Sequence, residues 1–138
     1  MEEKNFKNYK FMVPMYGWPI DLYYGKASDV KEYVENKWGV CFDNFDGYCN
    51  GYTSIMGKLC KNHKELNMFF FISSETEKFS PESGVNGIHT IHHEAIHCAW
   101  FILDYVGVHI SEENHEALTY LEGYIAKTVH NKILQWKK

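Results

Sequence analysis

The chain contains no arginine. All 14 of its basic residues are lysines, and its 18 acidic residues give the 138-residue chain a formal net charge of −4. Arginine supplies the bidentate hydrogen bonds that most often recognise phosphate groups and guanine edges. We therefore do not expect this protein to bind nucleic acid.

Long hydrophobic runs are also missing. No stretch approaches the ~18 apolar residues of a membrane span, and the densest stretch, 98–110, is interrupted by Asp104 and Gly107. The first ten residues, MEEKNFKNYK, are charged and polar, without the apolar segment that a signal peptide needs. We therefore expect a cytoplasmic protein that does not enter a membrane.

None of the four cysteines belongs to a CxxC pair. They are Cys41, Cys49, Cys60 and Cys98, and we interpret them as the reduced thiols of a cytosolic protein. An alternative stays open for three of them. Cys60 and His63 form a CxxH that could join Cys41 and Cys49 in a structural zinc site, although the spacings are irregular.

The composition is that of a folded domain, with 45% hydrophobic, 17% aromatic and 23% charged residues. The length predicts one domain over residues 1–138. In the first half, short apolar segments alternate with turn residues such as Asn50-Gly51, and one segment has helical spacing behind a serine cap. The predicted strands are 11–13, 22–24, 40–42 and 66–72, and the predicted helix is 28–38.

The strand predicted at 66–72, LNMFFFI, leaves two positions open. Its three phenylalanines favour the interior of a sheet. At an edge, the same strand could pair with an extended peptide substrate through backbone hydrogen bonds.

The second half predicts two helices. The first runs from about Ile88 to Gly107 and is apolar nearly all round, so we expect it to be buried. Ser111 can cap the second, which runs to about Leu134. This order of elements, with the strands first and the helices last, predicts an α+β domain. It has a small N-terminal sheet and a helix before two C-terminal helices. The expected buried stripe of the last helix is Leu118, Leu121, Ile125 and Val129.

The first of these helices carries HTIHHEAIHCAW, with four of the chain's eight histidines. His89, His93 and His97 cannot all bind one ion, because eight residues of helix span about 12 Å and zinc lies ~2.1 Å from each ligating nitrogen. The register His93-Glu94-Ala95-Ile96-His97 is HExxH. It gives zinc two imidazoles one turn apart and places a glutamate where it can act as general base. The alternative is a set of core histidines that find partners within the protein.

The third metal ligand is expected from the second helix. Glu116 lies 19 residues after His97, and a tight turn at Gly107 lets this helix fold back. A carboxylate would leave a fourth position open for water. Glu113, one turn earlier, and the neighbouring His115 are the rival ligands, whereas Glu112 points elsewhere.

HEAIH followed about twenty residues later by EALTY resembles the gluzincin metallopeptidases over residues 89–126. More loosely, the chain is similar to small proteins of phages and bacteria that are predicted to be metallopeptidases. The resemblance implies a minimal zincin-like domain with one Zn²⁺ per chain and a peptide or protein substrate. It makes His93, His97 and Glu116 the zinc ligands and Glu94 the catalytic base.

Two departures from the gluzincin pattern stand out. Where such peptidases often have an aspartate four residues after the third ligand, this chain has Tyr120, which offers a hydroxyl. We keep Tyr120 as a candidate catalytic residue that helps to stabilise an oxyanion, as Tyr124, His115 or His130 could also do.

The chain also ends about 20 residues after the second-helix motif, so no further lobe is expected to complete a deep cleft. The site would then be shallow, be completed by a protein partner, or be a relic. The alternative function is a structural or interaction protein with weak or no catalysis, for example a phage particle or assembly component, which would be virion-associated.

Overall fold

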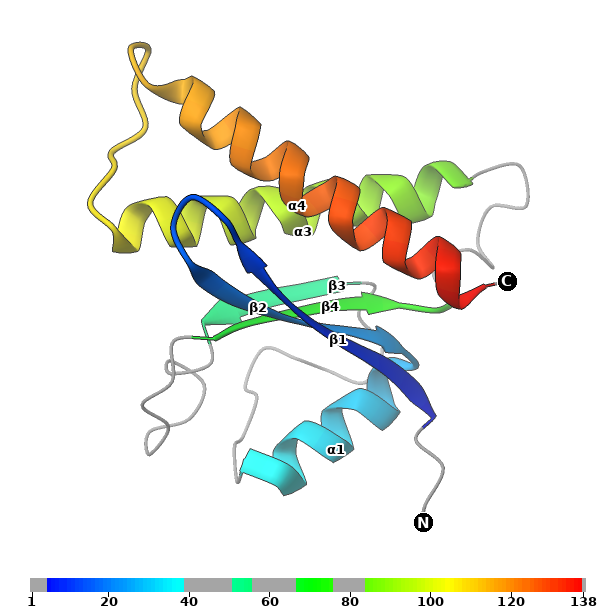
Figure 1. The fold of residues 1–138 in the computed structure, drawn as a ribbon. Coiled ribbons are helices and arrows are strands. Elements are labelled where there is room, and N and C mark those ends of the chain that lie inside the picture. The colour runs from blue at the N-terminus through cyan, green and yellow to red at the C-terminus, as the bar shows by residue number, and fades with distance from the viewer. Residues whose placement is uncertain (1–4, 39–50, 56–66, 76–83, 138) are drawn as a thin grey trace.

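A computed structural model describes residues 5–38, 51–55, 67–75 and 84–137 of the chain (Figure 1). The strand predicted at 40–42 lies outside these residues. So does the alternative zinc site of Cys41, Cys49, Cys60 and His63.

The described strands form one four-stranded sheet in the order β1-β2-β4-β3. β1 pairs antiparallel with β2, β2 pairs parallel with β4, and β4 pairs antiparallel with β3. The hairpin of β1 and β2 turns at Gly17, whose φ of +60° favours glycine. The bounds are β1 Phe6–Val13, β2 Trp18–Gly25, β3 Gly51–Ile55 and β4 Met68–Ser73.

Helices cover both faces of this sheet, which makes the protein an α+β fold as predicted (Figure 1). α1, Ala27–Trp38, lies on one face. α3, Gly84–Tyr105, and α4, His115–Trp136, lie on the other face and cross each other. Because side chains alternate along a strand, Phe70 of β4 belongs to the α3 and α4 core while Phe71 belongs to the α1 core.

β4 is an interior strand, because β2 and β3 pair with its two sides and all six of its residues are buried. Of the two positions left open for the segment 66–72, the interior one is therefore confirmed. The sequence does not predict β3, because the pair Asn50-Gly51 is typical of a turn. Among the described residues, β3 pairs only with β4 and so lies at an edge of the sheet.

α3 begins at Gly84, four residues earlier than predicted, and ends at Tyr105. Gly107 has φ +86° and stops the helix as expected: its N–H donates to Asp104 O, and the N–H of Val108 donates to Leu103 O. The expectation that the helix is buried all round was wrong. Its apolar residues Ile96 and Trp100 are 46% and 49% exposed, because neither the sheet nor α4 covers the side on which they lie.

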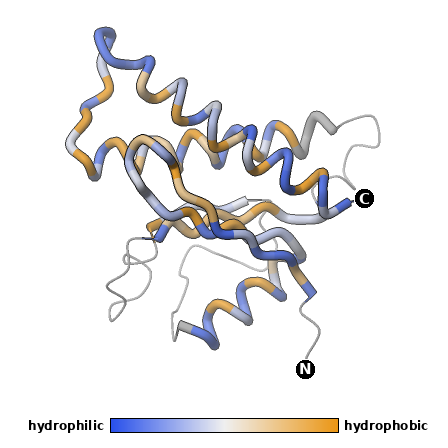
Figure 2. Tube along the Cα trace, in the orientation of Figure 1, coloured by the Kyte–Doolittle hydropathy of each residue, from blue (hydrophilic) through white to orange (hydrophobic). Residues whose placement is uncertain are grey.

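α4 begins later than predicted. Its N-cap is Asn114 rather than Ser111, because the Asn114 side chain accepts a hydrogen bond from the Ser111 N–H and closes a turn before the helix. Hydrophobic and hydrophilic residues alternate along α4 in Figure 2, as expected for a helix buried on one side. Leu118 of the expected stripe is only half-buried. The buried residues are Leu121, Ile125, Ala126, Val129 and Ile133.

No helix in the described parts of the chain is both long enough and apolar enough to cross a membrane.

Candidate functional site

Three histidines and a phenylalanine follow one another along the exposed side of α3. They are spaced four residues apart, so each lies about one helical turn from the next. The ring centroids of His89 and His93 are 6.4 Å apart, those of His93 and His97 4.8 Å, and those of His97 and Phe101 6.3 Å. His93 and His97 are thus the closest pair in this row.

The Nε2 atoms of His93 and His97 are 3.3 Å apart. Without a metal, one of these nitrogens can carry a proton that the other accepts. Two nitrogens that bind one tetrahedral zinc at ~2.1 Å are separated by about 3.4 Å. The two imidazoles therefore fit one metal ion with little rearrangement of either ring.

Glu94 points from α3 toward the edge strand β3, and only 6% of the residue is exposed. The Thr53 hydroxyl donates a hydrogen bond of 2.7 Å to Glu94 Oε1 and lies 3.3 Å from the Glu94 carbonyl oxygen. The other carboxylate oxygen, Oε2, lies 4.0 Å from His93 Nε2. One oxygen of Glu94 is thus held by β3, and the other is near the histidine pair.

Burial raises the pKa of Glu94 above its ordinary value, because a carboxylate loses hydration in the interior. The hydrogen bond from Thr53 and the positive charges that His93 and His97 can carry lower the pKa again by smaller amounts. The result is a carboxylate with an increased affinity for a proton, which is the property required of a general base that works near neutral pH.

Glu116 lies in the first turn of α4, as expected, and is exposed. Among the residues that the structure describes, no three His, Cys, Asp or Glu side chains lie close enough together to hold a metal ion. The structure therefore does not bring Glu116 to His93 and His97. The rivals Glu113 and His115 are also exposed and do not join the pair.

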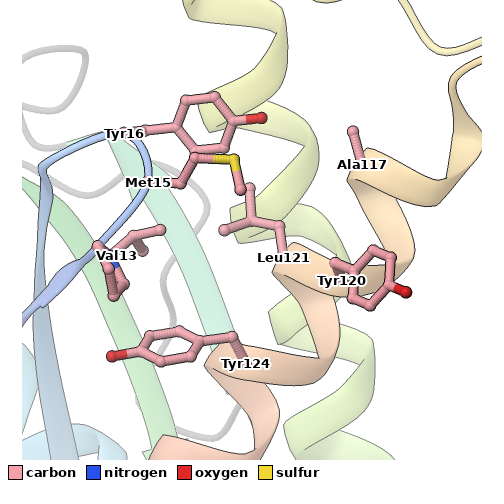
Figure 3. A pocket seen from close by; sticks show the side chains of 8 residues that line it. Val13, Met15, Tyr16, Ala117, Tyr120, Leu121 and Tyr124 are labelled. Atoms are coloured by element: carbon pink, nitrogen blue, oxygen red, sulfur yellow. The ribbon is translucent and has the colours of Figure 1, made fainter.

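Tyr120 lines an apolar pocket of about 370 Å³ between α4 and the turn of the β1–β2 hairpin (Figure 3). Tyr120 is 75% exposed and points away from the hairpin, whereas Tyr124 extends toward it. Neither His93, Glu94 nor His97 lines this pocket. The lining residues are Val13, Pro14, Met15, Tyr16, Ala117, Tyr120, Leu121 and Tyr124.

A polar contact also joins the two C-terminal helices. His92 Nδ1 on α3 lies 2.5 Å from Glu122 Oε1 on α4.

The buried Cys98 is a free thiol, and its pKa is raised well above the ordinary value, first by burial and then by the negative charge of Glu94. Cys98 is thus enclosed in the core, whereas His92 is exposed like His93 and His97.

Sequence reasoning missed Thr53, Gly51 and Glu122. β3 is only five residues long and half-buried, so the segment around Thr53 has no apolar alternation that would have predicted a strand facing Glu94. Glu122 lies two residues after the motif EALTY, and its contact with His92 depends on the angle at which α4 crosses α3.

Comparisons with models of protein families, with curated proteins and with solved structures give no significant match for this chain.

Proposed function

We propose that this protein is a zinc-dependent metallopeptidase that hydrolyses peptide or other amide bonds. The observation that carries the proposal is the close approach of His93 Nε2 and His97 Nε2, 3.3 Å apart, next to a buried carboxylate on the same helix. The pair matches the spacing of two ligands on one tetrahedral ion. A glutamate adjacent to the first ligand is the arrangement that metal-assisted hydrolysis needs.

His93 and His97 would hold the ion through Nε2, and Glu116 is the proposed third ligand. Catalytic zinc sites usually have three protein ligands and one open position. For Glu116 to join, the first turn of α4 must approach the exposed side of α3 when the ion binds. When bound, zinc supplies a Lewis acid that polarises a carbonyl and lowers the pKa of water.

Glu94 would do the proton chemistry. Its raised pKa favours acceptance of a proton from the attacking water, and Oε2 is the oxygen nearest to the histidine pair. The same carboxyl would then donate the proton to the leaving nitrogen, which returns Glu94 to its starting state. Tyr120 is the proposed donor to the oxyanion and, like Glu116, depends on a shift of α4.

A peptide is the proposed substrate because an edge strand lies beside the base. β3 carries Thr53, which contacts Glu94, and its second backbone edge has no strand partner among the described residues. An extended peptide could add to this edge through main-chain hydrogen bonds, which would place an amide bond near the histidine pair. His93 is exposed over 57% of its side chain, so the site is open and could be completed by a protein partner.

The first experiment is a measurement of metal content by mass spectrometry on protein purified without a histidine tag. We expect about one zinc per chain. Glu94→Gln should keep the zinc and lose most of the hydrolysis of internally quenched peptides, since a general base contributes roughly 10²- to 10⁴-fold. Glu122→Gln, the same change in a glutamate that contacts His92 on α3, is the control. A wild-type protein that binds no zinc after reconstitution would exclude the proposal.

A second candidate is a structural or interaction protein, for example a component of a phage particle, with weak or no catalysis. The observation that favours it is the lack of a third ligand beside His93 and His97 in the described part of the chain. This second candidate predicts that Glu94→Gln leaves every measurable property except stability unchanged.

The cytoplasmic location expected from the sequence stays a prediction.

A further inference from the structure

The edge strand β3 faces Glu94 with two residues, Gly51 and Thr53. Residues two apart on a strand point to the same side, and here that side faces α3. Thr53 donates its hydroxyl hydrogen bond to Glu94 Oε1. Gly51 lies against the other end of the same carboxylate.

Gly51 is required for space rather than for backbone conformation. Its φ is not positive, so the backbone there would accept other residues. A Cβ at this position would lie 2.7 Å from Glu94 Cγ, 3.0 Å from Glu94 Oε2 and 2.9 Å from Thr90 Cγ2. Any side chain at position 51 would therefore displace Glu94 or move β3 away from α3.

β3 is fixed in place by its pairing with the neighbouring strand β4. In the register of the sheet, Thr53 is opposite Phe70 and Gly51 is opposite Ile72, and both partners belong to the fully buried strand β4. The Thr53 hydroxyl and the space beside Gly51, where there is no side chain, therefore have fixed positions relative to α3. A glutamate side chain has several rotatable bonds and would otherwise sample many orientations.

We propose that Thr53 and Gly51 position the catalytic carboxylate of Glu94. The Thr53 hydroxyl fixes Oε1, and the absence of a side chain at Gly51 leaves room for Oε2 near His93. The inference rests on the proposed function in that it takes Glu94 as the base. With Oε1 occupied by Thr53, Oε2 is the oxygen that takes up and releases the proton. Thr53 and Gly51 are positioning residues, since they act through Glu94.

A purely structural role for Thr53 makes a different prediction. A buried carboxylate needs a hydrogen-bond donor whether or not it is catalytic. In that case loss of the hydroxyl would lower the free energy of unfolding but leave the turnover of the folded protein unchanged. Turnover and the local state of the carboxyl group must therefore be measured separately from stability.

The test compares Thr53→Val, which removes the hydroxyl and keeps the shape, with Thr53→Ser, which keeps the hydroxyl. Ser54→Ala removes a hydroxyl from the opposite face of the same strand and is the matched control. For each variant, kcat and KM are measured with the best-cleaved member of an internally quenched peptide library, and zinc content is measured alongside. Independently of zinc and activity, the ¹³C resonance of the Glu94 carboxyl carbon is recorded in the metal-free protein, assigned by its loss in Glu94→Gln.

We expect Thr53→Val to lower kcat roughly 10- to 100-fold, as loss of a group that orients a site residue typically does, with KM and zinc content unchanged. The Glu94 carboxyl resonance should shift. Thr53→Ser should restore most of kcat and the original resonance, and Ser54→Ala should match the wild type. Gly51→Ala should also lower kcat and shift the resonance, although the Thr53 hydroxyl is still present.

A Thr53→Val variant with wild-type kcat, or with an unmoved Glu94 resonance, would overturn the inference. Equal losses of kcat in Thr53→Val and Thr53→Ser would also overturn it, because the hydroxyl would then not be the cause. Failure of the proposed function looks different: the wild type itself would bind no zinc and cleave no peptide. The carboxyl resonance would still decide whether Thr53 fixes Glu94.

Discussion

Neighbouring side chains of α3 have opposite environments. His93 is exposed, whereas Glu94 is 6% exposed and Cys98, one turn later, is fully buried. The difference follows from the 100° that separates successive residues on a helix. One residue can thus face the solvent while the next keeps a desolvated carboxylate with a raised pKa.

The burial of Cys98 predicts low reactivity. The test uses a variant in which the other cysteines, Cys41, Cys49 and Cys60, are replaced by serine. At pH 8, a thiol reagent should react with Cys98 in the folded protein at least roughly 100-fold more slowly than in the protein unfolded by urea, because the reaction requires opening of the core. Equal rates in the two states would show that α3 does not bury this thiol.

The raised pKa of Cys98 also predicts how stability depends on pH. Above the ordinary thiol pKa the unfolded chain loses its proton while the folded protein keeps it, so the unfolded state binds fewer protons. The free energy of unfolding should therefore fall as pH rises through this range. In Cys98→Ala this part of the decrease should be absent, which urea unfolding at pH 7 and pH 9.5 would measure.

At the scale of elements, the glycines near the two C-terminal helices have different roles. Gly123 is inside α4, is exposed, and has open space where a Cβ would be. Gly107 ends α3 with φ +86°. Glycine costs a helix interior about 1 kcal/mol relative to alanine, whereas alanine at a left-handed position costs roughly 1–2 kcal/mol.

Gly123→Ala should therefore raise the free energy of unfolding by up to about 1 kcal/mol, and Gly107→Ala should lower it by roughly 1–2 kcal/mol. Urea unfolding followed by circular dichroism measures both. A loss of stability in Gly123→Ala would mean that another part of the chain packs closely against α4 at this position.

The first turn of α4 carries the most decisive prediction about the metal site. If Glu116 is the third ligand, Glu116→Ala should weaken zinc binding at least about 10-fold, whereas Glu113→Ala, in the preceding turn, should bind zinc like the wild type. Competition with a chromogenic chelator measures both affinities. Unchanged affinity in Glu116→Ala would remove this residue from the site and would fit its separation from the histidines in the structure.

On the scale of the whole molecule, one sheet is shared by two cores. The larger core lies between the sheet and the pair α3 and α4, and the smaller one lies between the sheet and α1. Phe70 and Phe71 are neighbours on β4, are both fully buried, and face the larger and the smaller core respectively. Both cores thus depend on the position of one interior strand.

Phe70→Ala and Phe71→Ala should each lower the free energy of unfolding by roughly 3–5 kcal/mol. Because β4 serves both cores, each variant should still unfold in a single transition when fluorescence and circular dichroism are compared. Only Phe70→Ala should also disturb Glu94, since Phe70 is opposite Thr53 in the sheet. Two separate transitions would show that the cores fold independently.

The amino-acid sequence determined the parts of this protein that depend on local pattern. Helical spacing and the stop at Gly107 predicted two C-terminal helices, and strands before helices predicted the α+β class. HExxH placed His93 and His97 one turn apart, and the structure brings their Nε2 atoms within 3.3 Å. These features follow from the geometry of a single helix and need no information about distant residues.

Only the tertiary structure decided which residues surround that motif. The partner of Glu94 is Thr53, 41 residues away on a strand whose short sequence gives no periodic signal. The exposed side of α3, and the distance of Glu116 from it, depend on the angle at which α4 crosses α3. That angle results from the packing of the two helices on each other and on the sheet, and no local sequence pattern encodes it.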